Sequence, residues 1–116
     1  MINKYRWKNR VFISLHNNSI LVKQQKELLD NVISELMERD MILIGFGGSE
    51  SPYSSEQSID LNKFRQELSQ TEDSFILVGK DGTVKSSWRL PVDPKIIFEI
   101  IDAMPMRKLE MRDKKA

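Results

Sequence analysis

Apolar and polar positions alternate along the chain in blocks that predict a mixed α/β domain. Continuous apolar runs, typical of strands buried on both faces, occupy residues 11–15, 41–46 and 75–78. Asp81 and Gly82 follow the third run, and Gly82 is expected to take a positive φ that closes a hairpin onto a strand over residues 83–88. Because such a hairpin must lie in a covered sheet, we expect the other segments to pack around it.

Apolar residues at helical spacing predict three helices. The stripes cover residues 19–39, 60–68 and 94–104. Asn18 or Ser19 is expected to cap the first helix, because a short polar side chain accepts hydrogen bonds from the orphan backbone N–H groups. Asp93 is expected to cap the last helix, with Pro94 as its first residue. The first strand, helix and second strand then form a βαβ unit with a right-handed crossover.

The remaining segments set the limits of the domain. The polar stretch GGSESPYSSEQS over residues 47–58 is expected to be an exposed loop. Pro105 is expected to kink or end the last helix, so that residues 105–116 form a kinked C-terminal extension with a frayed end. A chain of 116 residues is long enough for one core, and we expect a single domain over residues 1–116.

Charge and hydropathy argue against several classes of function. The formal net charge of +1 argues against a whole-domain surface for nucleic acid or anionic membrane. No apolar run approaches the roughly 20 residues of a membrane span, and the N-terminus lacks the apolar segment of a signal peptide. We expect a soluble protein of undetermined compartment, from which a leader could have been removed.

Residues 5–10 mix aromatic and basic side chains. We interpret them as a lead-in in which Tyr5 and Trp7 cover one end of the core while the charges remain in water. A contact with nucleic acid is the alternative interpretation, but no similar patch follows in the sequence.

Three segments carry a resemblance to a known family. They are YRWKNR at residues 5–10, LVGKDG at residues 77–82 and IDAMPMRKLEMR at residues 101–112. Together they resemble the domain-of-unknown-function 4174 family, also called the P-DUDES thioredoxin-like domain. The resemblance covers nearly the whole chain. It implies an α/β, thioredoxin-like fold, with a four-stranded mixed sheet flanked by helices in the order β-α-β-α-β-β-α, and it implies no settled activity.

The chain departs from working thioredoxins at the corner between the first strand and the first helix. Redox thioredoxins place Cys-x-x-Cys there, whereas this chain has His16, Asn17, Asn18 and Ser19. Cysteine is absent from the whole chain, which excludes thiol–disulfide exchange. We predict these four residues as binding residues because the fold keeps its site at this corner, and we assign no catalytic residue.

No residues are predicted to hold a metal or a cofactor. The glycine-rich stretch over residues 45–49 follows a strand, but no helix opens directly behind it, which argues against a phosphate site. No pair of histidines or carboxylates has the spacing of metal ligands.

The C-terminal extension is the second candidate binding region. Methionine and leucine side chains over residues 104–111 interleave with Arg107 and Arg112. Methionines recur at binding surfaces because they pack adaptably, and arginines suit carboxylate contacts. The alternative is that the apolar residues close the core while the arginines pair with nearby carboxylates.

These features favour a redox-inactive thioredoxin-like domain that binds an unidentified protein or small-molecule partner. Two alternatives are a non-thiol enzyme that uses the His16–Ser19 corner and a peroxiredoxin-like relative that has lost its nucleophile. A structural module within a larger assembly is the third alternative. The oligomeric state is undetermined by the sequence.

Overall fold

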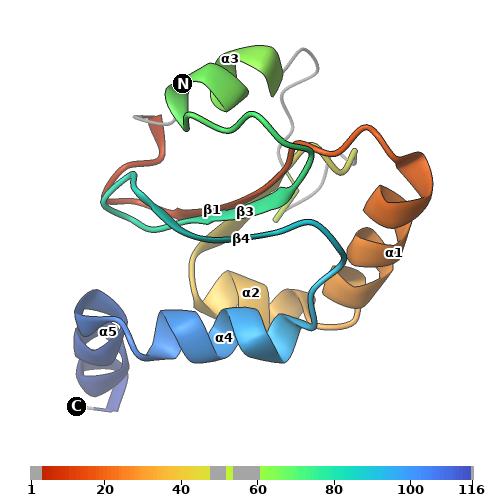
Figure 1. Cartoon of the computed structure of the whole chain (residues 1–116). Coiled ribbons are helices and arrows are strands. Elements are labelled where there is room, and N and C mark those ends of the chain that lie inside the picture. The colour runs from red at the N-terminus through yellow and green to blue at the C-terminus, as the bar shows by residue number, and fades with distance from the viewer. Residues whose placement is uncertain (1–3, 48–51, 54–60, 116) are drawn as a thin grey trace.

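The domain is built around a central sheet, as the computed structural model of residues 4–47, 52–53 and 61–115 shows (Figure 1). In chain order its elements are β1 (Arg10–Ser14), α1 (Ser19–Asp30), α2 (Ile33–Glu38), β2 (Met41–Ile44), α3 (Leu61–Glu67), β3 (Phe75–Val78), β4 (Val84–Trp88), α4 (Pro94–Asp102) and α5 (Pro105–Lys115). Asp93 accepts a hydrogen bond from the backbone N–H of Lys95, so the predicted cap of α4 is confirmed.

The four strands form one mixed sheet in the order β2-β1-β3-β4. β1 is parallel to β2 and antiparallel to β3, and β3 is antiparallel to β4. Phe12 of β1 lies between Leu43 of β2 and Leu77 of β3. This arrangement confirms the predicted thioredoxin-like fold.

Helices cover both faces of the sheet: α3 lies on one face, and α1, α2 and α4 lie on the other (Figure 1). Successive β1 side chains point to opposite faces. Phe12 therefore packs in the cluster that includes Leu36 and Ile97, whereas Val11 packs in the cluster that includes Phe64. α5 follows α4 at a corner and lies beside the end of α4 (Figure 1).

The prediction of one helix over residues 19–39 is wrong, because the segment contains two helices, α1 and α2. α1 ends at Asp30, with Asn31 as its C-cap. Val32 has φ −132° and ψ 31°, outside the helical region, and precedes α2. Asn and Val both have low helix propensity, and the apolar periodicity across the break gave no sign of it.

The prediction of an exposed loop over residues 47–58 is wrong at two positions. Pro52 and Tyr53 are buried. Tyr53 forms a parallel bridge with Leu43 and its hydroxyl donates a hydrogen bond to Asp30. The neighbouring residues 48–51 and 54–60 lie outside the described residues.

No helix in the described part of the chain has the length and apolar character needed to cross a membrane.

Two glycines allow a test of backbone geometry. Gly82 has φ +81°, as predicted, and Gly45 has φ +86°. A Cβ at Gly82 would meet only the Arg6 side chain at 3.7 Å, whereas a Cβ at Gly45 would lie 2.6 Å from the backbone oxygen of Ser14. The second contact cannot relax without moving β1.

We expect Gly82→Ala to lower the free energy of unfolding by about 1–2 kcal/mol, the cost of a left-handed conformation. Gly45→Ala should lower it further, because the clash with Ser14 adds to that cost. Urea denaturation of both variants measures which one loses more free energy of unfolding. Equal losses would show that the contact at Gly45 relaxes.

Candidate functional site

The corner between β1 and α1 contains three exposed residues from the predicted binding set. Asn18 Oδ1 accepts hydrogen bonds from the backbone N–H groups of Ile20 and Leu21, at 3.0 and 3.2 Å. Asn18 is therefore the N-cap of α1, one of the two predicted caps. Asn17 and Ser19 are exposed beside it.

His16, the fourth residue of the corner, is partly buried. Its Nε2 lies 2.8 Å from the carbonyl oxygen of Arg89, and its ring centroid lies 5.2 Å from that of Phe75. Because a carbonyl only accepts, Nε2 is the donor in this hydrogen bond. Nδ1 is buried and has no hydrogen-bond partner among the described residues.

This corner lacks the pairing that nucleophilic catalysis needs. A base accepts the proton of its nucleophile, but Nδ1, the His16 nitrogen that does not contact Arg89, makes no hydrogen bond with Ser19 or any other described residue. The described residues also contain no cluster of three or more histidines or carboxylates that could hold a metal ion. An open hollow of about 520 Å³ lies here, with Lys23 and Lys26 on its wall.

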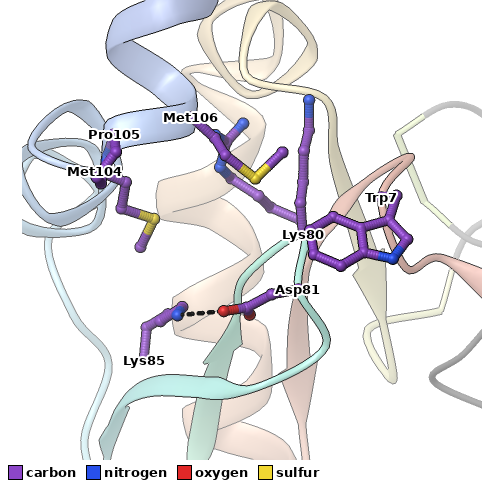
Figure 2. A pocket seen from close by; sticks show the side chains of 8 residues that line it. Trp7, Lys80, Asp81, Lys85, Met104, Pro105 and Met106 are labelled. Carbon is purple, nitrogen blue, oxygen red and sulfur yellow. Dashed lines mark hydrogen bonds and ion pairs between the residues drawn. The ribbon is translucent and has the colours of Figure 1, made fainter.

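A second hollow, of about 330 Å³, lies where the N-terminal segment, the hairpin turn and the α4–α5 corner meet (Figure 2). We call it the hairpin pocket. It is lined by Trp7, Arg10, Lys80, Asp81, Lys85, Met104, Pro105 and Met106. The pocket therefore combines an aromatic ring, two thioethers and several charges.

Trp7 forms one side of the hairpin pocket. It is 59% exposed, so the prediction that it covers the core is wrong. Its φ is +67°, a strained value for a residue with a large side chain. The backbone N–H of Trp7 donates to the carbonyl oxygen of Lys80 at 2.6 Å, which fixes the N-terminal segment on the hairpin. Arg6 lies over the indole ring, 5.3 Å from its centroid.

Met104, Pro105 and Met106 form the opposite side (Figure 2). α4 ends at Asp102, and Pro105 begins α5. Proline suits the first position of a helix, where its missing N–H leaves no hydrogen bond unmade. The turn between the two helices brings the methionine sulfurs beside the hairpin (Figure 2).

An ion pair between Asp81 and Lys85 lies on the hairpin side of the pocket (Figure 2), with Lys85 Nζ 2.8 Å from Asp81 Oδ2. Asp81 Oδ1 also accepts hydrogen bonds from the backbone N–H and the hydroxyl of Thr83. Burial acts to raise the pKa of Asp81, but the hydrogen bonds from Lys85 and Thr83 outweigh it and lower the pKa to about 2. Asp81 is therefore ionised at neutral pH.

Two buried cations complete the lining. Arg10 is only 1% exposed, and its Nη1 donates to Glu110 at 3.2 Å and to the carbonyl oxygen of Arg39 at 3.1 Å. Lys80 donates to Asp40 at 2.9 Å and to Glu110. The Nε of Arg10 is buried and has no hydrogen-bond partner among the described residues. An unpaired buried donor on a charged group is costly.

Arg107 lies in the same network and is only 1% exposed. It pairs with Glu38 at 3.0 Å, with Asp102 at 3.2 Å and with Glu110 at 3.6 Å. Its guanidinium is thus occupied by carboxylates of the domain, whereas Arg112 is exposed on α5. The structure therefore does not bring the two predicted arginines together.

The ion-pair network fixes α5 to the sheet and the other helices. It joins Arg10, Arg39, Lys80 and Arg107 to Glu38, Asp40, Asp102 and Glu110. Hydrogen bonds from Arg39 lower the pKa of Asp102, although burial acts to raise it. Burial opposes the same change at Glu110, but hydrogen bonds from Lys80 and Arg10 lower its pKa.

Sequence reasoning found parts of the hairpin pocket without joining them. The basic–aromatic segment, the hairpin turn and the methionines of the tail each stood out, but they are separated by about seventy and by about twenty residues of chain. Lys80 and Lys85 gave no signal, because lysines beside a turn are ordinary surface residues. Only the tertiary structure, which places both lysines in the lining with Trp7 and Met106, identifies them as pocket residues.

Comparison with known proteins identifies one family. The model of a family described as "Domain of unknown function (DUF4174)" matches residues 1–110. No curated protein matches the chain in sequence. A solved structure described as "Crystal structure of Trgpx in apo form" is similar, with a TM-score of 0.48 and 15% sequence identity. The match covers 86% of this chain and 84% of that chain.

We expect stability to fall in acid because Glu110 and Asp102 have lowered pKa values in the folded state. Such groups contribute stability above their ordinary pKa values of 4.5 and 3.8, and the contribution is lost as pH falls through the folded values. Glu110→Gln should cost about 2–3 kcal/mol at neutral pH, since Arg10 and Lys80 lose a partner.

Denaturation curves between about pH 6 and pH 3 check this, because Glu110→Gln and the parent should converge in acid. Glu27→Gln, at an exposed position of α1, is the matched control and should follow the parent at every pH. A constant difference between Glu110→Gln and the parent would contradict the electrostatic explanation.

Proposed function

The chain belongs to the DUF4174 family, a domain of unknown function, and we propose that its thioredoxin-like fold serves as a redox-inactive binding module. The binding site is the hairpin pocket, and the ligand is a small organic molecule with an apolar body. The observation that carries this proposal is the convergence of an exposed, strained tryptophan with two methionines over a pair of buried cations.

The strain at Trp7 supports a role in binding and not in folding. A positive φ at a non-glycine residue costs on the order of 1–3 kcal/mol and persists where surrounding contacts hold it. Here the hydrogen bond to Lys80 holds the backbone while the indole stays largely in water. An exposed aromatic side chain held in one place is the kind of group that anchors a ligand.

The cavity suits a small molecule in size and character. Its volume of about 330 Å³ is near the lower end for ligand pockets, which range over about 300–1,000 Å³. Trp7, Met104 and Met106 offer apolar and polarizable contacts, and a few charged groups can orient the ligand.

The alternative of an enzyme at the His16–Ser19 corner has weaker support. His16 Nε2 donates a hydrogen bond to the carbonyl oxygen of Arg89, and Nδ1, the nitrogen that would have to accept from Ser19, is buried and makes no hydrogen bond with a described residue. The hairpin pocket lies elsewhere in the fold, so the two interpretations involve different residues.

We expect the domain to show no catalysis of insulin reduction by dithiothreitol. The chain has no cysteine and therefore no sulfur that can form a mixed disulfide. Turbidity of reduced insulin measures the rate, which should equal the background. A reproducible increase across preparations would contradict the redox-inactive assignment.

We expect octanoate or octanol to shift the amide NMR signals of Trp7, Gly82 and Met106 while leaving Asn17 and Ser19 unchanged. Trp7→Gly should abolish these shifts yet keep the free energy of unfolding within about 1 kcal/mol of the parent, because glycine relieves the positive φ. Measuring both the NMR shifts and the free energy of unfolding distinguishes loss of a ligand contact from loss of the fold.

Two matched variants control for added charge. Met106→Glu, in the pocket, should abolish the shifts, whereas Met37→Glu, exposed on α2, should preserve them. If neither compound shifts the pocket signals in the parent, the hairpin pocket is not the binding site.

A further inference from the structure

We infer that the ligand of the hairpin pocket carries one carboxylate, bound by Lys85, while its apolar body lies against Trp7 and Met106. This inference rests on the proposed function, because it names the class of molecule for the same pocket. It follows from the sign, the accessibility and the hydrogen bonding of the charges around the cavity.

The lining of the pocket has an excess of positive charge. Three cations, Arg10, Lys80 and Lys85, line it with a single carboxylate, Asp81. The carboxylates that pair with Arg10 and Lys80, principally Glu110, are not part of the lining. A ligand therefore meets the positive side of these pairs, which favours an anion.

Lys85 is the cation best placed to bind that anion. Its side chain is 30% exposed, whereas those of Lys80 and Arg10 are 9% and 1% exposed. An ammonium has three N–H donors, and among the described residues Lys85 uses one of them, toward Asp81. A carboxylate can thus accept a hydrogen bond from Lys85 without displacing Asp81, which Thr83 holds in place.

The unpaired Nε of Arg10 is a second, independent observation that points to an anion. Arg10 lines the pocket, is almost completely buried and keeps one N–H without an acceptor among the described residues. A buried guanidinium with an unmet donor is stabilised by negative charge nearby, even where the two groups do not touch. A bound carboxylate would supply that charge.

The apolar side of the pocket determines the size and character of the ligand body that carries the carboxylate. Trp7 and Met106 lie on opposite sides of the cavity, with Lys80 between them in the view of Figure 2. The space suits a short aliphatic chain or a single ring. Because the volume is small, we assign a free organic acid and not a polypeptide chain as the ligand.

The test compares octanoate with octanamide, which has the same chain and no charge. Isothermal titration calorimetry, with NMR to locate the bound molecule, should show octanoate binding about tenfold tighter, the size expected for one charge-assisted hydrogen bond. Lys85→Met should remove this preference and leave the affinity for octanamide unchanged.

Two further variants isolate the charge at the site. Lys95→Met, at an exposed position of α4, makes the same change in net charge outside the pocket and should preserve the preference. Asp81→Asn keeps the Oδ1 acceptor that Thr83 uses but removes the competing negative charge, so octanoate should bind severalfold tighter.

The outcomes distinguish this inference from the proposed function. Equal binding of octanoate and octanamide at the pocket, or a preference that survives Lys85→Met, would overturn the carboxylate assignment and leave the binding module standing. A peptide with a free leucine C-terminus that binds as tightly as octanoate would reassign the pocket to protein chain ends. If neither compound binds, the proposed function and the carboxylate assignment both fail.

Discussion

The structure of the whole C-terminal end depends on the pairing of charges that the fold has taken out of water. Arg10 and Arg107 are almost completely buried, and Lys80 is nearly so. Removing such charges from water costs several kcal/mol each unless a carboxylate is held close to them. Glu110 meets this requirement for all three, because it contacts Arg10, Lys80 and Arg107 at once.

This arrangement explains why α5 is ordered although it buries little apolar surface. Leu109 and Met106 of α5 are exposed, so hydrophobic burial is not its main attachment. Its position follows from Arg107 and Glu110, which reach α2, β1 and the hairpin. The same ion pairs hold Met106 and Lys80 in the geometry that creates the hairpin pocket, so stability and the proposed binding site share one set of contacts.

The corner between β1 and α1 is held by structural contacts. The corner that carries thiols in redox thioredoxins is occupied here by a helix cap, Asn18, and by His16 bonded to the segment after β4. The first contact caps α1, and the second joins the corner to the segment after β4. The features that point to a ligand lie instead at the hairpin and the α4–α5 turn.

The sequence by itself determined the strands, the hairpin turn at Gly82 and the cap of α4, because these depend on local periodicity and turn chemistry. The thioredoxin-like fold was implied by the resemblance of three segments to the DUF4174 family. The sequence also shows that this chain contains no thiol. Only the tertiary structure decided that Arg10 and Arg107 are buried partners of Glu110 and that Trp7 stays exposed. The physical reason is that the burial and pairing of a charge depend on segments far apart in the chain, and local patterns contain no information on which carboxylate meets which cation.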